Sequence, residues 1–344
     1  MTNWINIAQF LQNGLESGRF TSYAVRIDHG ADSVEFCAPG TDRNTLFDIA
    51  SMGKVLVTAP LILRAVGTGQ LSLDDPLCRF FDAPPDKRNI TVRQLLTHSS
   101  GIVRIPIPPE AAAAGTDAVA AHILAHPLAF APDTRVVYSC NGYILLGYIA
   151  EKIFGAPLDE LFERFIRTPL SLTRSKFCAT LDEPNTAVSY RMADTGDCRY
   201  DDENVRILHG IAGSGGSFWS LADIARYVSA VMTRSSLLYA PRCYALAERD
   251  WTPPPLEVGR GLGWLIADRR YAQTDRLFPA GSFGHCGHTG TSMFMSRAEN
   301  LSVIVLTNAT RCLNAANHFA GYDYGRIEAM RAALHRAVAA DLGI

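Results

Sequence analysis

A serine and a lysine three residues apart are the most reactive combination in this sequence. In Ser51-Met52-Gly53-Lys54, a helix would place the hydroxyl and the amine on one face, with Cβ atoms about 5–6 Å apart. At a helix N-terminus the dipole favours developing negative charge, and partial desolvation lowers the pKa of a lysine, so Lys54 can activate Ser51 as a nucleophile. Taken alone, the same spacing also fits a serine N-cap followed by a surface lysine.

The residues around this pair resemble the nucleophile segment of the serine β-lactamase and penicillin-binding-protein superfamily. The resemblance begins with residues 47–60, FDIASMGKVLVTAP. It continues in residues 69–76 (GQLSLDDP) and 90–102 (ITVRQLLTHSSGI), which look like segments of class C β-lactamases and related esterases. His98 in the second of these is interpreted as a structural turn residue, not a catalytic one. The resemblance extends in order over roughly residues 5–340.

A second family element, the Y-x-N box, is matched by Tyr138-Ser139-Cys140. Cys140 stands where the family has asparagine, and Asn141 follows the box, because a shifted register would break the match of the downstream helix. The resemblance implies that Tyr138 is a proton shuttle beside Lys54, as a phenol near an ammonium can be. The alternative for Tyr138 is a buried structural tyrosine.

The third family element is a K-T-G or H-x-G box on a strand, and residues 283–292 (FGHCGHTGTS) offer two registers for it. We take His285-Cys286-Gly287 as the box, because family sequences commonly read FGHTGxTGTS, and this makes His288 the next residue. The other register, His288-Thr289-Gly290, stays open, as does the alternative that both histidines are polar residues on a strand edge.

The resemblance also implies the contacts of a substrate with these boxes. His285 is a catalytic-site candidate, and the backbone amides of Ser51 and His288 are expected to form the oxyanion hole. Because they lack side chains, Gly287 and Gly290 are expected to let a substrate lie against the strand.

Two cysteines depart from the family pattern at positions that normally offer polar contacts to substrate. Cys140 replaces asparagine and Cys286 replaces threonine, and a thiol is only a weak donor. Both are candidate substrate-binding residues, and their presence favours simple esters over penicillins and D-Ala-D-Ala peptides. Alternatively they are small packing residues, or a disulfide pair if their Cα atoms lie within about 7 Å.

The fold class that follows is α+β: an antiparallel sheet flanked by helices, with an all-helical subdomain. Hydrophobic periodicity predicts a helix over 5–15, strands at 23–27 and 33–36 and a turn at 29–32. It further predicts a buried helix over 51–66, kinked at Pro60, then helices at 91–96, 109–126, 141–154, 158–166 and 220–232. Strands at 262–266, 293–295 and 301–306, with a turn at 297–300, precede a helix over 326–340. We expect one β-lactamase-like domain over 1–344, with a discontinuous α/β part (about 1–55 and 258–344) around a mostly helical part (about 56–257).

The composition of the chain argues against several classes of binding partner. The 344 residues are enough for a large core, and a formal charge of −2 leaves no basic excess for nucleic acid and no polybasic segment for a membrane surface. The N-terminus resembles no signal peptide, and no run of about 18 apolar residues is evident, so a cytoplasmic protein is expected. Eight cysteines without a CxxC motif argue against zinc and favour reduced thiols; no cofactor and no metal are expected.

The functional hypothesis is a serine hydrolase that forms an acyl-enzyme with a small-molecule ester, amide or lactam, more esterase-like than penicillinase-like. The alternatives are an acyltransferase of a biosynthetic pathway, which shares the first half-reaction, and an inactive binding protein on the same fold. The presence together of Ser51, Lys54 and Tyr138 argues against the latter. No G-x-S-x-G motif supports an α/β-hydrolase, and the oligomeric state is left open.

Overall fold

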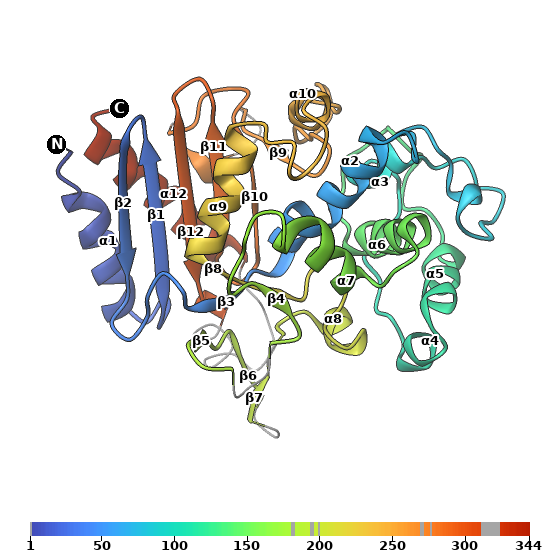
Figure 1. Ribbon diagram of the computed structural model, residues 1–344, viewed down its shortest axis with the longest axis horizontal. Coiled ribbons are helices and arrows are strands. Elements are labelled where there is room, and N and C mark those ends of the chain that lie inside the picture. Colours follow the sequence, from blue (N-terminus) through green and yellow to red (C-terminus); the bar gives the residue numbers. More distant parts are fainter. Residues whose placement is uncertain are drawn as a thin grey trace.

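A six-stranded antiparallel sheet forms the backbone of the fold (Figure 1), as expected. The computed structural model describes residues 2–179, 183–192, 196–198, 200–268, 272–275, 277–310 and 324–344. The two ends of the chain supply the strands, in the order β2-β1-β12-β11-β10-β9. Their bounds are β1 (Tyr23–His29), β2 (Asp32–Cys37), β9 (Leu265–Ile266), β10 (Phe283–Cys286), β11 (Ser292–Ser296) and β12 (Leu301–Thr307).

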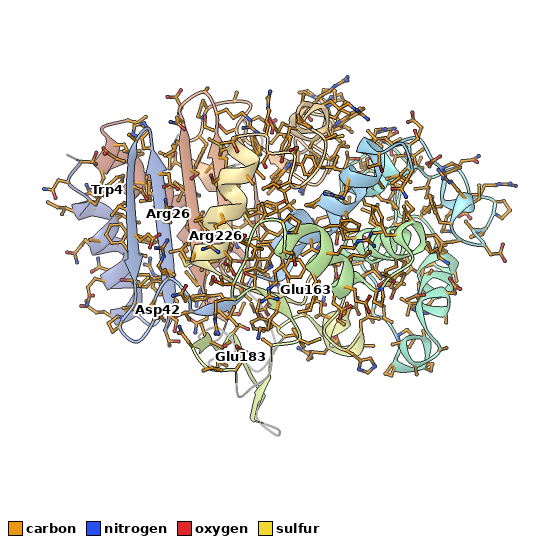
Figure 2. The ribbon with its side chains drawn as sticks, in the orientation of Figure 1. Trp4, Arg26, Asp42, Glu163, Glu183 and Arg226 are labelled. Atoms are coloured by element: carbon orange, nitrogen blue, oxygen red, sulfur yellow. The ribbon has the colours of Figure 1, made fainter. Side chains whose placement is uncertain are left out.

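Helices cover both faces of this sheet and create two hydrophobic cores. The helices α1 (Ile5–Glu16) and α12 (Tyr324–Leu342) pack on one face, and α9 (Leu221–Met232) packs on the other (Figure 1). Because side chains alternate along a strand, Phe294 faces the α1/α12 core, whereas Met293 faces the larger core. Polar pairs lie nearer the surface: Arg26 on β1, labelled in Figure 2, bonds Glu35 on β2 at 2.6 Å.

The remaining helices lie to one side of the sheet, around the buried α6. They are α2 (Ala59–Gly67), α3 (Val92–Leu96), α4 (Pro109–Ala113), α5 (Thr116–Ala125), α6 (Cys140–Phe154), α7 (Leu158–Phe162), α8 (Glu203–Ile207) and α10 (Arg242–Glu248). A second sheet, in the order β4-β8-β3-β5, joins them to the first sheet. It comprises β3 (Leu46–Asp48), β4 (Lys176–Phe177), β5 (Thr186–Ala187) and β8 (Ser217–Ser220), and a separate hairpin comprises β6 (Tyr190–Met192) and β7 (Gly196–Cys198).

The helix expected over 51–66 is a composite of three helical types. A 3₁₀ turn, η1 (Ala50–Met52), is followed by a π-helical turn, η2 (Lys54–Thr58), and then by α2. In the wide turn the amide of Ala59 reaches back to the carbonyl of Lys54. Pro60 lies in the first turn of α2, where its missing N–H needs no intrahelical acceptor. A π-helical turn therefore lies immediately ahead of the proline, and such turns are themselves places where helices bend.

Other differences from the predicted elements have local causes. The helix expected over 109–126 is interrupted at Gly115, which has a φ of +100° and begins α5. The strand expected over 262–266 is confined to Leu265–Ile266, after Gly263 with a φ of +94°. The stretch Ala50–Gly67 is long and apolar enough to cross a membrane, contrary to expectation, but 78% of it is buried inside the protein. This buried stretch is the central helix of the larger hydrophobic core.

Candidate active site

Ser51 lies on the short turn that follows β3, and neighbouring strands hold this turn in place. The Asp48 carboxylate accepts a hydrogen bond from the amide of Ala50 at 2.8 Å. Thr289 donates its hydroxyl to the carbonyl of Asp48 at 2.8 Å, and Thr291 donates to the carbonyl of Ile49 at 3.2 Å. These contacts attach the nucleophile turn to the loop between β10 and β11. They also turn Thr291 inward, so that it is not presented to a substrate.

Lys54 is completely buried beside Ser51. Its Nζ lies 3.0 Å from Ser51 Oγ, 2.7 Å from the carbonyl oxygen of Ser214 and 3.5 Å from Cys140 Sγ. Burial lowers the pKa of Lys54 below its usual value, because the charged form is poorly solvated there. A neutral lysine at this distance can accept the proton of the serine hydroxyl.

Tyr138, which lies just ahead of α6, also contacts Ser51. Its hydroxyl donates to Ser51 Oγ at 2.6 Å, and Lys54 Nζ lies 5.0 Å from the centre of its ring. Burial raises the pKa of Tyr138 above its usual value, although solvent that reaches the exposed 39% of the residue weakens this effect. The phenol therefore keeps its proton at neutral pH and is available as an acid. The structure brings together Ser51, Lys54 and Tyr138, as expected.

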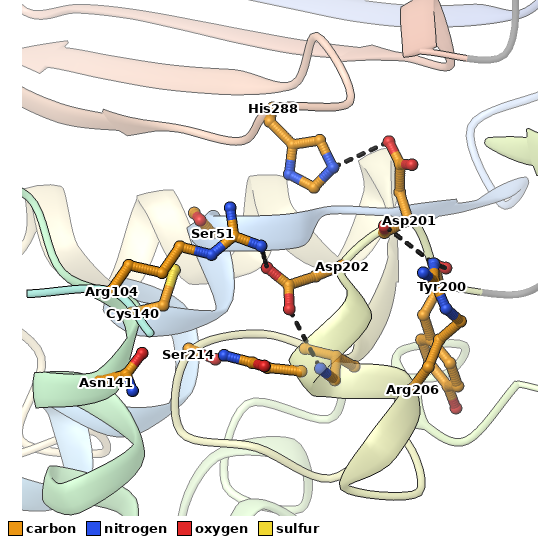
Figure 3. A network of polar contacts seen from close by, with 12 residues as sticks. Ser51, Arg104, Cys140, Asn141, Tyr200, Asp201, Asp202, Arg206, Ser214 and His288 are labelled. Carbon is orange, nitrogen blue, oxygen red and sulfur yellow. Dashed lines mark hydrogen bonds and ion pairs between the residues drawn. The ribbon is translucent and has the colours of Figure 1, made fainter. Parts of the chain in front are cut away.

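Cys140 and Asn141 begin α6, which Ser139 caps through a bond from the amide of Gly142 at 3.3 Å. The Cys140 thiol is buried against Lys54, inside the site. Asn141, which lies beside Cys140 in Figure 3, instead bonds the amide and the carbonyl of Ile105, at 3.4 and 3.3 Å. Asn141 therefore fixes a neighbouring loop, and the residue of the box nearest the lysine is Cys140.

His285 and Cys286 point to opposite faces of β10, as successive strand residues must. His285 is buried with its ring centre 6.3 Å from that of Tyr138, and burial lowers its pKa well below the usual value. Cys286 packs instead against the α1/α12 core, with its Sγ 3.8 Å from Gln273 Oε1. The expected substrate contact of the Cys286 thiol therefore finds no support in the geometry. Cys140 and Cys286 do not form the disulfide considered as an alternative.

Gly287 and Gly290 lack a side chain because protein atoms pack against them, not because a substrate needs the space. A Cβ atom at Gly287 would lie 2.4 Å from the carbonyl oxygen of Ile49 and 2.2 Å from Thr291 Oγ1. At Gly290, with a φ of +99°, it would lie 2.1 Å from Thr307 Oγ1. Protein atoms, not a substrate, fill the space that these glycines leave. Gly287 thus lets β10 approach the nucleophile turn.

His288 lies in the loop between β10 and β11 and pairs with Asp201 at 2.8 Å (Figure 3). Burial opposes its charging, but the carboxylates of Asp201, Asp48 and Asp202 together outweigh burial, so the pKa of His288 is raised above its usual value. His288 and Ser51 line the same pocket, together with Asp48, Asp202 and Ser214. The oxyanion hole formed by the amides of Ser51 and His288 stays a prediction.

Several residues of this neighbourhood have no motif in the sequence. Asp201 and Asp202 precede α8, and Arg104 lies 3.6 Å from Asp202 (Figure 3). They come from segments about one hundred residues apart, so that only the fold brings them together. Burial raises the pKa of Asp48 to about 6, which the His288 charge opposes. The described residues contain no group of side chains that could hold a metal ion.

Comparison with known proteins identifies the family of this site. The protein-family model described as Beta-lactamase matches residues 7–318, which include every residue of the three boxes. The chain belongs to the Beta-lactamase family. A relative in this family, described as "Putative D-alanyl-D-alanine carboxypeptidase" from Escherichia coli (strain K12), is 26% identical over 299 residues, or 77% of this chain and 69% of the relative.

Solved structures of similar fold cover almost the whole chain. A class C beta-lactamase mutant has a TM-score of 0.75 at 18% identity, with 96% of each chain covered. EstCE1, titled a hydrolase with promiscuous acyltransferase activity, has a TM-score of 0.71 at 21% identity, with coverage of 96% and 97%. These likenesses establish the β-lactamase and penicillin-binding-protein fold, and the family relationship supports a serine hydrolase.

Proposed function

We propose that this Beta-lactamase-family protein hydrolyses a small-molecule ester through a covalent intermediate on Ser51, and that it turns over esters better than penicillins. One observation carries the proposal: Ser51 Oγ lies within hydrogen-bonding distance of both Lys54 Nζ, at 3.0 Å, and Tyr138 Oη, at 2.6 Å. A hydroxyl between a base of lowered pKa and a protonated phenol has the partners that nucleophilic attack requires.

The reaction follows from these contacts. Ser51 Oγ attacks the carbonyl carbon while Lys54 Nζ accepts the hydroxyl proton, and the carbonyl oxygen becomes an oxyanion. When the tetrahedral intermediate collapses, the bond to the leaving alcohol breaks, and Tyr138 supplies the proton that the alkoxide needs. The proton held by Lys54 then returns to Tyr138. A water molecule then attacks the acyl-enzyme carbonyl and loses its proton to Lys54. When this second intermediate collapses, Ser51 Oγ leaves and takes a proton from Tyr138, which releases the acid and the free serine.

The preference for esters rests on Cys140. In relatives that bind acylamino substrates, the asparagine of the Y-x-N box bonds the substrate amide, and a thiol replaces such a bond poorly. Loss of one bond of this kind typically costs about 1–3 kcal/mol. The Cys140 thiol is moreover in contact with Lys54, which leaves it less available to a ligand. Simple esters need no such contact.

Intact-protein mass spectrometry tests the proposal. The protein is exposed separately to a fluorophosphonate, a penicillin and a p-nitrophenyl ester, and peptide mapping locates any added mass. We expect the fluorophosphonate and ester labels on Ser51 and none on the Ser51→Ala variant. Full esterase activity of Ser51→Ala, or labelling at another residue, would contradict the proposed nucleophile. A kcat/KM for penicillin above that for the ester would contradict the proposed preference.

Acyl transfer to an alcohol is the second candidate, because it shares the acyl-enzyme and differs only in the second nucleophile. The likeness to EstCE1, whose title includes acyltransferase activity, favours testing it. With a p-nitrophenyl ester and increasing concentrations of a primary alcohol, hydrolysis alone gives only the free acid. A transferase instead gives the new ester as the main product at alcohol concentrations far below that of water.

A further inference from the structure

His98, which follows α3, holds the backbone on both sides of Tyr138. Its carbonyl oxygen accepts a hydrogen bond from the amide of Val137 at 3.0 Å. Its Nδ1 accepts a second bond from the amide of Ser139 at 3.2 Å. The residue between these two contact points is Tyr138, so that one histidine fixes the chain immediately before and after the phenol.

The imidazole of His98 also supports the Tyr138 ring directly. The ring centres of His98 and Tyr138 lie 4.7 Å apart. The ring centre of Tyr143, on α6, lies 5.1 Å from that of His98. Tyr143 is itself held, because its hydroxyl donates to the carbonyl of Leu96 at 2.9 Å. His98 is only 2% exposed and so has little room to turn. It therefore links α3 and α6 to the aromatic ring that reaches Ser51.

The hydrogen bond from Ser139 fixes the tautomer of this imidazole. A backbone amide can only donate, so Nδ1 of His98 carries no proton and Nε2 carries it. Burial, with the nearby charge of Arg260, lowers the pKa of His98 well below its usual value, which keeps the ring neutral. A charged imidazolium would have a proton on Nδ1 and could not accept the Ser139 bond.

The backbone at His98 suggests that a simpler residue would serve if only a turn were needed. His98 has a φ of +58°, a left-handed conformation that glycine and asparagine adopt more easily. Asparagine shares with neutral histidine an acceptor at the δ position, whereas glycine lacks both the acceptor and the ring. Substitution of His98 by asparagine or by glycine therefore distinguishes the effect of the left-handed turn from the effect of the hydrogen bond to Ser139.

We propose that His98 is a positioning residue for Tyr138, which it holds within reach of Ser51 Oγ through the Nδ1 contact to Ser139 and through ring packing. This inference deepens the proposed function and rests on the role given there to Tyr138 as the proton donor. It goes beyond the expectation that His98 is only a turn residue.

The test compares His98→Asn with His98→Gly, because both tolerate the left-handed backbone. The first readout is the rate at which an alkyl ester labels Ser51 as the acyl-enzyme, because its alkoxide leaving group needs the proton that Tyr138 supplies. A displacement of about 1 Å in a catalytic group can reduce the rate by about 10²-fold. We therefore expect labelling of His98→Gly to be slower by about that factor, and His98→Asn to recover at least about tenfold of it.

The matched control is His335→Asn on α12. His335 is also fully buried and also uses Nδ1, which lies 2.9 Å from the carbonyl oxygen of Gln273, but it packs in the α1/α12 core against Phe278 and Phe294. We expect His335→Asn to lower the melting temperature without slowing the labelling of Ser51. Equal slowing in the control and in His98→Gly would reduce the effect to general destabilisation and overturn the proposal.

Crystal structures of the variants provide a second readout that does not depend on catalysis. We expect the contact of Tyr138 with Ser51 Oγ to persist in His98→Asn and to be lost in His98→Gly. An unchanged contact and an unchanged rate in His98→Gly would overturn the positioning role, and equal losses in the two variants would overturn the part assigned to Nδ1. If the wild-type protein is not labelled at all, the proposed function fails, while the crystal structures still decide whether His98 positions Tyr138.

Discussion

Lys54 Nζ lies 3.5 Å from Cys140 Sγ, so a thiol contacts the amine that faces the nucleophile. The contact joins the π-helical turn of η2 to the first residue of α6. A thiol is a weak donor and a weak acceptor, whereas an asparagine amide both donates and accepts strongly. The composition of this one position therefore affects both the lysine and any substrate amide that enters the site.

The first prediction concerns this cysteine. Cys140→Asn should increase kcat/KM for a penicillin relative to a p-nitrophenyl ester by about tenfold or more, because the amide restores a bond worth about 1–3 kcal/mol. Parallel kinetics with the two substrates measure the ratio. Cys286→Thr is the matched control and should leave the ratio unchanged, because its side chain faces the α1/α12 core. A ratio that moves with Cys286→Thr and not with Cys140→Asn would reverse our assignment of the two cysteines.

The second prediction concerns the two groups that contact the serine. Lys54→Ala and Tyr138→Phe should each slow acylation of Ser51 by at least roughly 10²-fold, the usual effect of a positioned acid or base. Rapid-quench measurement of acyl-enzyme formation from an alkyl ester, whose alkoxide leaving group needs a proton, isolates this step. Tyr244→Phe on α10 is the control, because its buried hydroxyl bonds the carbonyl of Ser235 and not Ser51. Acylation at the wild-type rate in Tyr138→Phe would remove the phenol from the mechanism.

The third prediction is a pH dependence of stability at His288. The pKa of His288 is raised in the folded protein, so its charged pair with Asp201 contributes fully below about pH 6.5 and is lost as pH rises through the folded pKa. His288→Gln should therefore cost about 2 kcal/mol of unfolding free energy at pH 6 and clearly less at pH 9. Urea unfolding at the two pH values measures the difference. In an Asp201→Asn background the excess cost of His288→Gln at pH 6 over pH 9 should be reduced or reversed, because burial then opposes the charged imidazole.

The fourth prediction concerns the close approach of β10 to the nucleophile turn. Gly287→Ala should lower the free energy of unfolding by about 1–3 kcal/mol and impair acylation, because its Cβ meets the carbonyl oxygen of Ile49. Gly142→Ala is the control, since its Cβ would lie 3.6 Å from its nearest neighbour, on Leu95. In the helix α6 it should stabilise by about 0.5–1 kcal/mol. Denaturant unfolding and stopped-flow acylation compare the pair, and a neutral Gly287→Ala would show that the two segments can separate.

The sequence predicts those site residues that are close to one another in the chain or belong to a recognisable family box. Ser51 and Lys54 share one turn, and Tyr138 precedes a helix with a serine cap, so the three were predicted together and lie together. The roles of Cys286 and Gly287 could not be predicted, because they depend on which face of β10 each residue meets.

Contacts between distant segments escaped prediction for a different reason. Asp201 meets His288 across 87 positions of the chain, and His98 meets Ser139 across 41. No periodicity encodes either pairing, because each depends on the packing of elements that are separate in sequence. Similarly, the π-helical turn at Lys54–Thr58 reads as ordinary apolar helix until the bond from Ala59 to Lys54 is seen.

The different exposure of the two groups beside Ser51 has a consequence for exchange with bulk water. Lys54 is 0% exposed, whereas 39% of Tyr138 is accessible to solvent. Hydrogen isotopes from deuterated solvent can therefore enter the catalytic group at the phenol and pass to the amine through Ser51 Oγ, which contacts both. The tyrosine is thus the connection between an enclosed lysine and the surrounding medium, and the serine is both nucleophile and relay.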